Sequence, residues 1–205
     1  MAIAAPARAQ SGCPDPQATN YNAAATSNDG SCLYPTTTTA LLTKTTLASA
    51  VQESSGLLYT GGSLWTHNDS GNPAVLFRVD SVSGRVLQQV AISNYPNVDW
   101  EDLAADAQVV PVAVVVAKIA EVDVLRVLRV AKADLGPAAT TALAQEIAFT
   151  YPDQLDFTPR TNNHNFDCEA FFVANDSLHL FTKNWGDLKT RYYTVPAAPG
   201  AYMAH

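Results

Sequence analysis

The chain has 205 residues, with 12 Lys and Arg against 19 Asp and Glu, which gives a formal net charge of −7. This balance argues against a nucleic-acid partner, because binding to phosphate needs positive surface. No apolar run approaches the roughly 20 residues of a membrane span, so we expect none. A hydrophobic fraction of 47% is enough for a packed core, so one domain with a small module is expected.

Residues 1–10 have features of a remnant of a secretory signal peptide. Ala7-Arg8-Ala9 has the small-x-small form of a cleavage site, and Gln10 or Ser11 would begin the mature chain. This predicts a secreted protein, extracellular or at the cell surface. The alternative is an N-terminal tail without a targeting role.

Residues 11–34 form a small module bracketed by Cys13 and Cys32, which we expect to be paired. Small units with little core are commonly stapled in oxidising compartments, and closing this loop is worth roughly 3 kcal/mol. The module's Cys-Pro-Asp-Pro and Asp-Gly-Ser-Cys segments resemble a cysteine-paired repeat of secreted Bacteroidetes proteins. Four side chains offer calcium ligands or, alternatively, caps for turns: Asp15, Asn20, Asn22 and Asp29.

Residues 35–50 are rich in Thr and are predicted to be a linker. The third cysteine, Cys168, lies between Asp167 and Glu169. Two adjacent carboxylates raise the pKa of a thiol, so we expect a buried and unreactive side chain.

A repeated motif organises residues 51–205. Glu53–Leu57, Asp99–Leu103 and Asp167–Phe171 share the pattern acid-x-(Glu or Ser)-x-(Leu or Phe), and another apolar residue follows seven positions later in each copy. The copies begin 46 and 68 residues apart, and a four-stranded propeller blade takes about 40–50 residues. The motif therefore predicts blades, the second with an insertion.

Turn residues divide the copies into short strands. We expect strands over 55–59, 64–66, 75–80 and 85–92 in the first copy, and over 171–173, 178–182 and 191–195 in the last. Only Ala138–Ala148 has the composition of a short helix. The predicted fold class is all-β: an incomplete β-propeller of about three blades, residues 51–205, after the disulfide-stapled module.

Longer segments carry a wider resemblance. Leu64-Trp-Thr-His-Asn-Asp-Ser-Gly, Val98-Asp-Trp-Glu-Asp-Leu-Ala and Phe166-Asp-Cys-Glu-Ala-Phe resemble secreted Bacteroidetes β-propeller proteins. Many members of that family carry a C-terminal signal for type IX secretion. More distantly, the acidic motif is similar to one in phytase-like and esterase-like propellers.

The sequence departs from that family in two places. The apolar run Val109–Ile119 stands where the family has a polar turn, which indicates a frameshift or a buried central strand. The sequence ends after about three blades, whereas propellers close with 4–8. Together these features predict a truncated or frameshifted member.

In a propeller the innermost strands converge, so the repeated acids should gather at one end of the channel. Clustered carboxylates repel unless a cation neutralises them, and calcium suits an oxygen-rich site. The predicted calcium ligands are Glu53, Asp99, Glu101, Asp167 and Glu169. Alternatively, these acids accept hydrogen bonds from backbone amides of the next blade.

Three consecutive polar residues, His67, Asn68 and Asp69, are predicted to lie at the channel rim. Neighbours in sequence cannot easily converge into a catalytic triad, so no catalytic residue is assigned. Inter-blade packing accounts for Trp65, Trp100 and Trp185. The expected function is a calcium-stabilised scaffold that binds an unknown extracellular ligand. The alternatives are a calcium-dependent hydrolase of phosphate or ester bonds and a non-functional truncated gene product.

Overall fold

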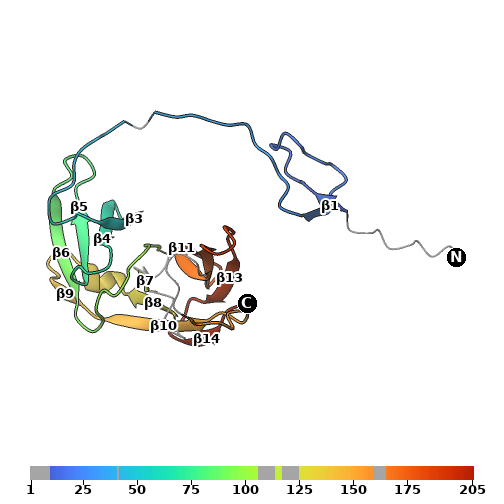
Figure 1. Ribbon diagram of the computed structural model, residues 1–205. Helices are drawn as coiled ribbons and strands as arrows, with labels where there is room; N and C mark the ends of the chain where they lie inside the picture. Colours follow the sequence, from blue (N-terminus) through green and yellow to red (C-terminus); the bar gives the residue numbers. More distant parts are fainter. Residues whose placement is uncertain (1–9, 41, 106–113, 117–124, 159–164) are drawn as a thin grey trace. The chain divides into compact units, whose positions relative to one another are not determined.

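The structure is a computed structural model that describes residues 10–40, 42–105, 114–116, 125–158 and 165–205. The chain divides into two compact units, Met1–Thr43 and Lys44–His205 (Figure 1). Most of the expected signal remnant, residues 1–9, lies outside the described residues. So does most of the apolar run after Val109, of which only residues 114–116 are described.

The first unit is the cysteine-bracketed module. Cys13 and Cys32 form a disulfide, as predicted, next to the short parallel strands β1 (Ser11–Gly12) and β2 (Ser27–Asn28). All four side chains considered as calcium ligands instead accept hydrogen bonds from backbone amides: Asp15 from Gln17, Asn20 from Leu33, Asn22 from Ala24 and Asp29 from Ser31. The contacts of Asp15, Asn22 and Asp29 span two residues and favour the interpretation that these side chains stabilise turns, whereas Asn20 links to a segment 13 residues away.

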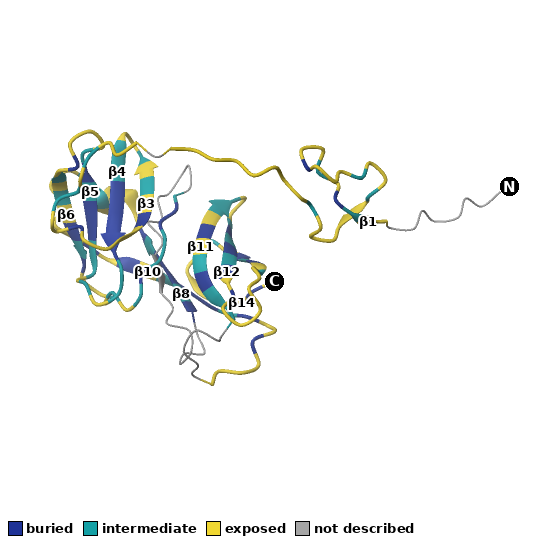
Figure 2. Ribbon diagram, turned by 45° about the horizontal axis from the view of Figure 1, so that its top comes forward, coloured by how far each residue is buried: buried dark blue, intermediate teal, exposed yellow. Residues whose placement is uncertain are grey.

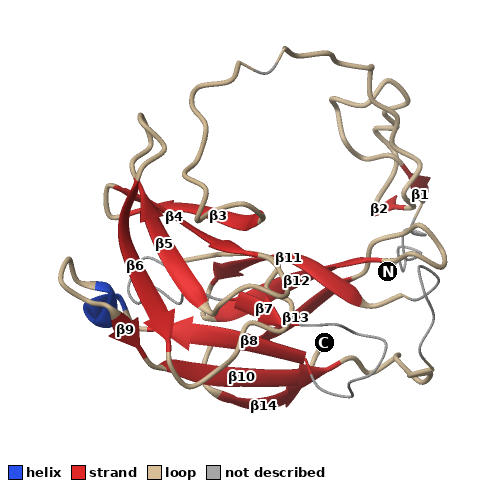
Figure 3. Ribbon diagram, turned by 60° about the vertical axis from the view of Figure 1, so that its left-hand side comes forward, coloured by secondary structure: helices blue, strands red, loops and turns tan. Residues whose placement is uncertain are grey.

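The second unit contains three sheets, so the all-β prediction is confirmed (Figure 3). The first sheet has the order β3 (Ser54–Thr60), β4 (Ser63–Asn68), β5 (Val75–Val79), β6 (Val86–Ile92) and β9 (Thr141–Ala142). The second has the order β14 (Gly200–Met203), β10 (Ala144–Thr150), β8 (Leu125–Val130) and β7 (Val114–Val116). The third consists of β11 (Asp167–Ala174), β12 (Ser177–Lys183) and β13 (Tyr192–Pro196).

The strands predicted in the first and last copies are confirmed, but the helical expectation for Ala138–Ala148 is wrong. That segment contains β9 and most of β10, and β10 pairs antiparallel with β8 from Ala144 opposite Val130 to Phe149 opposite Leu125. Helix propensity is a weak preference that burial in a sheet overrides. The described helical element is the four-residue 3-10 turn η1 (Lys132–Leu135), and no helix in these parts of the chain is long and apolar enough to cross a membrane.

Short parallel strands join neighbouring sheets. After β8, the chain adds β9 in parallel to the outer strand β6 of the first sheet. After β13, it adds β14 in parallel to β10 of the second sheet. The same connection therefore occurs twice, each time linking a sheet to the one before it. This repetition agrees with the sequence repeat.

Two apolar layers of the core lie one on each face of the second sheet (Figure 2). On β8, Leu125 and Val127 belong to the cluster shared with the third sheet, whereas Leu128 and Val130 belong to the cluster shared with the first. Each such fully buried side chain is worth roughly 1.5–3 kcal/mol. The second sheet is thus the middle layer of a three-sheet stack.

The predicted linker does not extend to residue 50 as a free segment. Leu47 and Val51 pack with Phe77 and Val79 on the outer face of the first sheet. Thr45 Oγ1 also donates a hydrogen bond to the carbonyl of Ser83. The boundary between the units falls after Thr43 because apolar residues beyond it belong to the sheet's packing.

Candidate functional site

Three of the acidic residues lie close together, one just after β4 and two in the second copy of the motif. One oxygen each of Asp69, Asp99 and Glu101 lies within 4.8 Å of the other two, and all three side chains are half-buried. Asp69 follows β4, whereas Asp99 and Glu101 belong to the second copy of the motif. Residues from two copies thus form this group, which we call the acidic cluster.

Glu101 is the member of the acidic cluster whose pKa is strongly raised. Burial, followed by the charges of Glu169, Asp99, Asp69 and Asp167 in that order, together raise its pKa from an ordinary 4.5 to about 8. A carboxyl surrounded by like charges resists ionisation. At neutral pH the raised pKa therefore favours the protonated form of Glu101 when no cation is bound.

The two predicted ligands on β11 lie close enough to act on Glu101 but also have partners of their own. The Asp167 carboxylate accepts a hydrogen bond of 2.9 Å from the Trp185 indole N–H. The Glu169 carboxylate forms a 2.9 Å ion pair with Lys183. They are placed as outer members of the acidic group rather than in the cluster itself.

Glu53, the fifth predicted ligand, positions the loop after β4. Its carboxylate accepts a hydrogen bond of 2.7 Å from the Asn72 side chain, and its carbonyl accepts one of 2.8 Å from the Asp69 amide. Asp69, which the sequence indicated only as a rim residue, takes the position in the cluster that the motif suggested for Glu53.

Asn97 holds the two halves of the cluster together. Its side-chain amide donates to the carbonyls of Asn68 and Asp69 at 3.0 and 2.8 Å, and its oxygen accepts from the Trp100 amide at 3.2 Å. Asn97 and Asn165 each stand two residues before the first acid of their motif copy, Asp99 and Asp167. That spacing was the available signal for this positioning residue.

Asp102, which is not one of the five predicted ligands, makes a hydrogen bond of the kind that the alternative hypothesis expected of those acids. Its carboxylate accepts from the Phe171 amide of β11 at 3.2 Å and from the Leu103 amide at 2.7 Å. Burial raises the pKa of Asp102, and these two amides oppose that rise. Asp102 therefore links the second motif copy to the third.

His67 and Asn68, which were predicted to lie at the channel rim, are both buried. His67 is fully buried, its ring packs edge-on against Trp100 at 5.6 Å, and burial lowers its pKa, which favours the neutral imidazole. The Asn68 side-chain amide donates to the Ala50 carbonyl. Both residues precede the acidic cluster in the chain and are buried next to it, and of the three residues only Asp69 belongs to the cluster.

Cys168 and the three tryptophans have environments that packing and local contacts explain. Cys168 is fully buried, and burial raises its pKa to about 12, as an unreactive thiol requires. Trp65 and Trp100 pack between the first and second sheets as expected, whereas Trp185 is 37% exposed. That exposure leaves its ring available to the Lys183 ammonium, 4.2 Å from the ring centroid.

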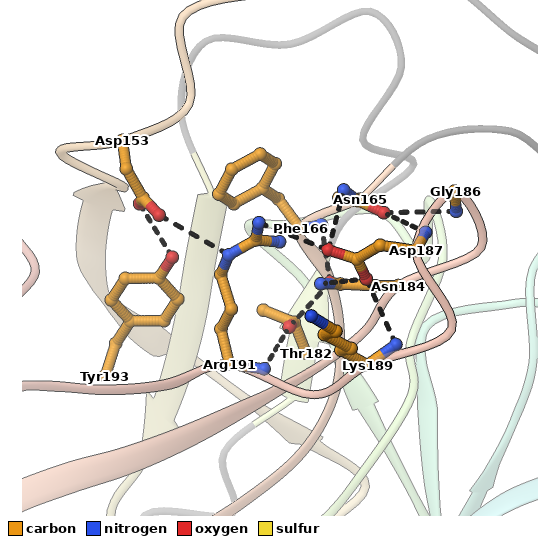
Figure 4. A network of polar contacts seen from close by, with 10 residues as sticks. All are labelled: Asp153, Asn165, Phe166, Thr182, Asn184, Gly186, Asp187, Lys189, Arg191 and Tyr193. Atoms are coloured by element: carbon orange, nitrogen blue, oxygen red, sulfur yellow. Dashed lines mark hydrogen bonds and ion pairs between the residues drawn. The ribbon is translucent and has the colours of Figure 1, made fainter. Parts of the chain in front are cut away.

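A polar network fixes the turn between β12 and β13 (Figure 4). Asp187 accepts hydrogen bonds from the Asn184 side chain, the Lys189 amide and Arg191. Arg191 also forms a 3.5 Å ion pair with Asp153, which accepts a 2.6 Å hydrogen bond from the Tyr193 hydroxyl. Arg191 and Lys183 are thus paired with acids, so neither is a free anion-binding group.

No family model matches the chain, and no curated protein is similar to it at a significant level. The resemblance to secreted propellers therefore continues to rest on the motifs.

Proposed function

We propose that this protein is a secreted or cell-surface β-propeller scaffold whose acidic cluster binds calcium. In this proposal residues 51–205 supply about three blades, and each of the three stacked sheets would be one of them. The cation would be held by Asp69, Asp99 and Glu101, with Asp167 and Glu169 completing the negative field. The disulfide of the N-terminal module supports an oxidising compartment.

One observation carries the proposal: three carboxylate oxygens from separate parts of the chain lie within 4.8 Å of one another. Three half-buried carboxylates so close together repel, and a divalent cation removes that repulsion. Calcium accepts six to eight oxygens in flexible geometry, so carboxylates and water can complete its shell. A cation held there joins the loop after β4 to the second motif copy.

Calcium titration of the full chain by isothermal calorimetry tests the proposal. We expect one site in the second unit, lost in Asp99→Asn and retained in the control Asp134→Asn, which removes an exposed carboxylate in η1. Magnesium should bind more weakly, because it demands regular octahedral geometry and keeps its water. Equal calcium binding by the native chain and Asp99→Asn would refute the site.

A calcium-dependent hydrolase of phosphate or ester bonds is the second candidate. The observation in its favour is the pKa of Glu101, which at about 8 would allow this carboxyl to donate or accept a proton near neutral pH. Assays with p-nitrophenyl phosphate and p-nitrophenyl acetate in calcium separate the candidates. Turnover that disappears in Glu101→Gln favours the hydrolase, whereas calcium binding without turnover favours the scaffold.

A further inference from the structure

A cavity lies at the end of the first sheet that is away from the acidic cluster. It has a volume of about 290 Å³ and is lined by the β3–β4 turn together with Ser63, Trp65, Arg78, Lys132, Leu135 and Pro137. The acidic cluster is near the start of β3, where the Ser54 strand end meets Asn68, and the cavity is at the end of β3 that contains Thr60. About 20 Å of strand separates them, at 3.3 Å per residue.

The charge of this cavity is opposite to that of the whole chain. Its lining contains two cationic side chains, Arg78 and Lys132, and no carboxylate, although the chain has a net charge of −7. Among the described residues, neither cation has a recorded ion pair, whereas Arg126, Lys183 and Arg191 are each paired with an acid. The Nε atom of Arg78 is buried and has no hydrogen-bond partner.

The walls are held by the same sheet that presents the arginine. Arg78 lies directly opposite Trp65 on β4 and Gln88 on β6, so the three side chains form a row on one face. The Gln88 amide donates to the carbonyls of Gly136 and Ala139 at 2.7 and 2.8 Å. These bonds fix the segment after η1, which brings Pro137 to the cavity.

We propose that this cavity binds a small organic anion in which a carboxylate or phosphate group is attached to a flat apolar body. The planar guanidinium of Arg78 matches both oxyanions through paired hydrogen bonds. Lys132 adds charge at the exposed side. The apolar body packs between Trp65, Leu135 and Pro137, and the volume suits a single-ring molecule, at the lower end of small-molecule pockets. This site does not depend on the calcium proposal.

The test uses benzoate and phenyl phosphate as the two anionic probes, with benzyl alcohol as the neutral probe and inorganic phosphate as the probe without an apolar body. Binding to the full chain is followed by calorimetry at low salt. We expect at least one organic anion to bind ten or more times more tightly than benzyl alcohol and inorganic phosphate, and the stronger of the two identifies the oxyanion. Equal binding of the charged and neutral probes, or no binding at millimolar concentration, overturns the proposal.

Variants locate the binding. Arg78→Gln should weaken the anion at least tenfold, Arg78→Lys by less, and Lys132→Gln about threefold. Arg85→Gln removes an exposed arginine outside the cavity and should leave the affinity unchanged. Melting curves check that each variant folds. If the Arg78 variants do not fold, Lys132→Gln still tests the site, because Lys132 is exposed and its replacement should not affect folding. Anion affinity that is equal in the native chain, Arg78→Gln and Lys132→Gln places the ligand elsewhere and overturns the proposal.

Discussion

Replacing Glu101 with Gln should stabilise the calcium-free protein at alkaline pH. The folded pKa of Glu101, about 8, lies above its ordinary value of 4.5. Between these values the folded state holds a proton that the unfolded state has released, so the free energy of unfolding falls as pH rises. A glutamine cannot ionise, so the variant should lack this part of the fall.

The expected size follows from the same two values. A rise from 4.5 to about 8 corresponds to about 5 kcal/mol at full strength. Glu101 is only half-buried, so water screens its neighbours, and we expect about 2 kcal/mol. For a domain of this size, that corresponds to a melting temperature roughly 4–8 °C higher for Glu101→Gln at pH 9.

Calcium should reverse the order of the two proteins. The ion replaces the proton of Glu101, so its affinity for the native chain should rise by up to tenfold per pH unit as pH approaches 8. Melting curves between pH 5 and 9, in EDTA and in excess calcium, measure both effects. In calcium the native chain should melt above Glu101→Gln, and Asp134→Asn should follow the native chain throughout. If Glu101→Gln and the native chain have parallel pH profiles in EDTA, the electrostatic reasoning is wrong.

Substitutions at two positions and one labelling experiment test the packing between the motif copies. A Cβ at Gly56 would lie 2.7 Å from His67 Nε2 and 2.9 Å from the Leu103 amide nitrogen. Gly56→Ala should therefore lower the free energy of unfolding by about 1–3 kcal/mol, measured by chemical denaturation. The control Gly136→Ala should change it little, because the nearest atom to a Cβ there is 3.8 Å away. Asp102→Ala leaves the Phe171 amide unpaired and should cost about 1–3 kcal/mol, with Asp102→Asn milder; equal melting temperatures would contradict this. Cys168 should react with Ellman's reagent only on unfolding, and rapid labelling of the native chain at pH 8 would show that the thiol is accessible.

The sequence was most informative where local chemistry repeats. Glycine-rich turns and alternating apolar residues fixed the strands of the first sheet, because turns and side-chain alternation are local properties. The segment Ala138–Ala148 was misassigned because its alanines favour a helix in isolation. What makes it a strand is its pairing with β8, a contact that its own residues do not encode.

Prediction of the site was limited in the same way, because local sequence does not specify long-range contacts. The motif grouped Glu53, Asp99, Glu101, Asp167 and Glu169 because equal positions of a repeat are expected to lie together. It could not identify Asp69, which reaches the cluster through the loop after β4 and the hydrogen bonds of Asn97. A motif specifies which residues are equivalent, but the length and direction of a loop decide which acids meet.

The equivalence of the motif copies also bears on the exposed aromatic face of the third sheet. Phe172 lies opposite His179 on the third sheet as Leu58 lies opposite Trp65 on the first, with a strand irregularity before each pair. Leu58 and Trp65 pack into the cluster shared with the second sheet, whereas Phe172 is 46% exposed and stacks on His179 at 4.5 Å. In a stacked repeat each unit carries an apolar face that packs against its neighbour, so an aromatic residue at this position of the third sheet is expected. By this equivalence, the exposed face that carries Phe172 corresponds to the face of the first sheet that the second sheet covers.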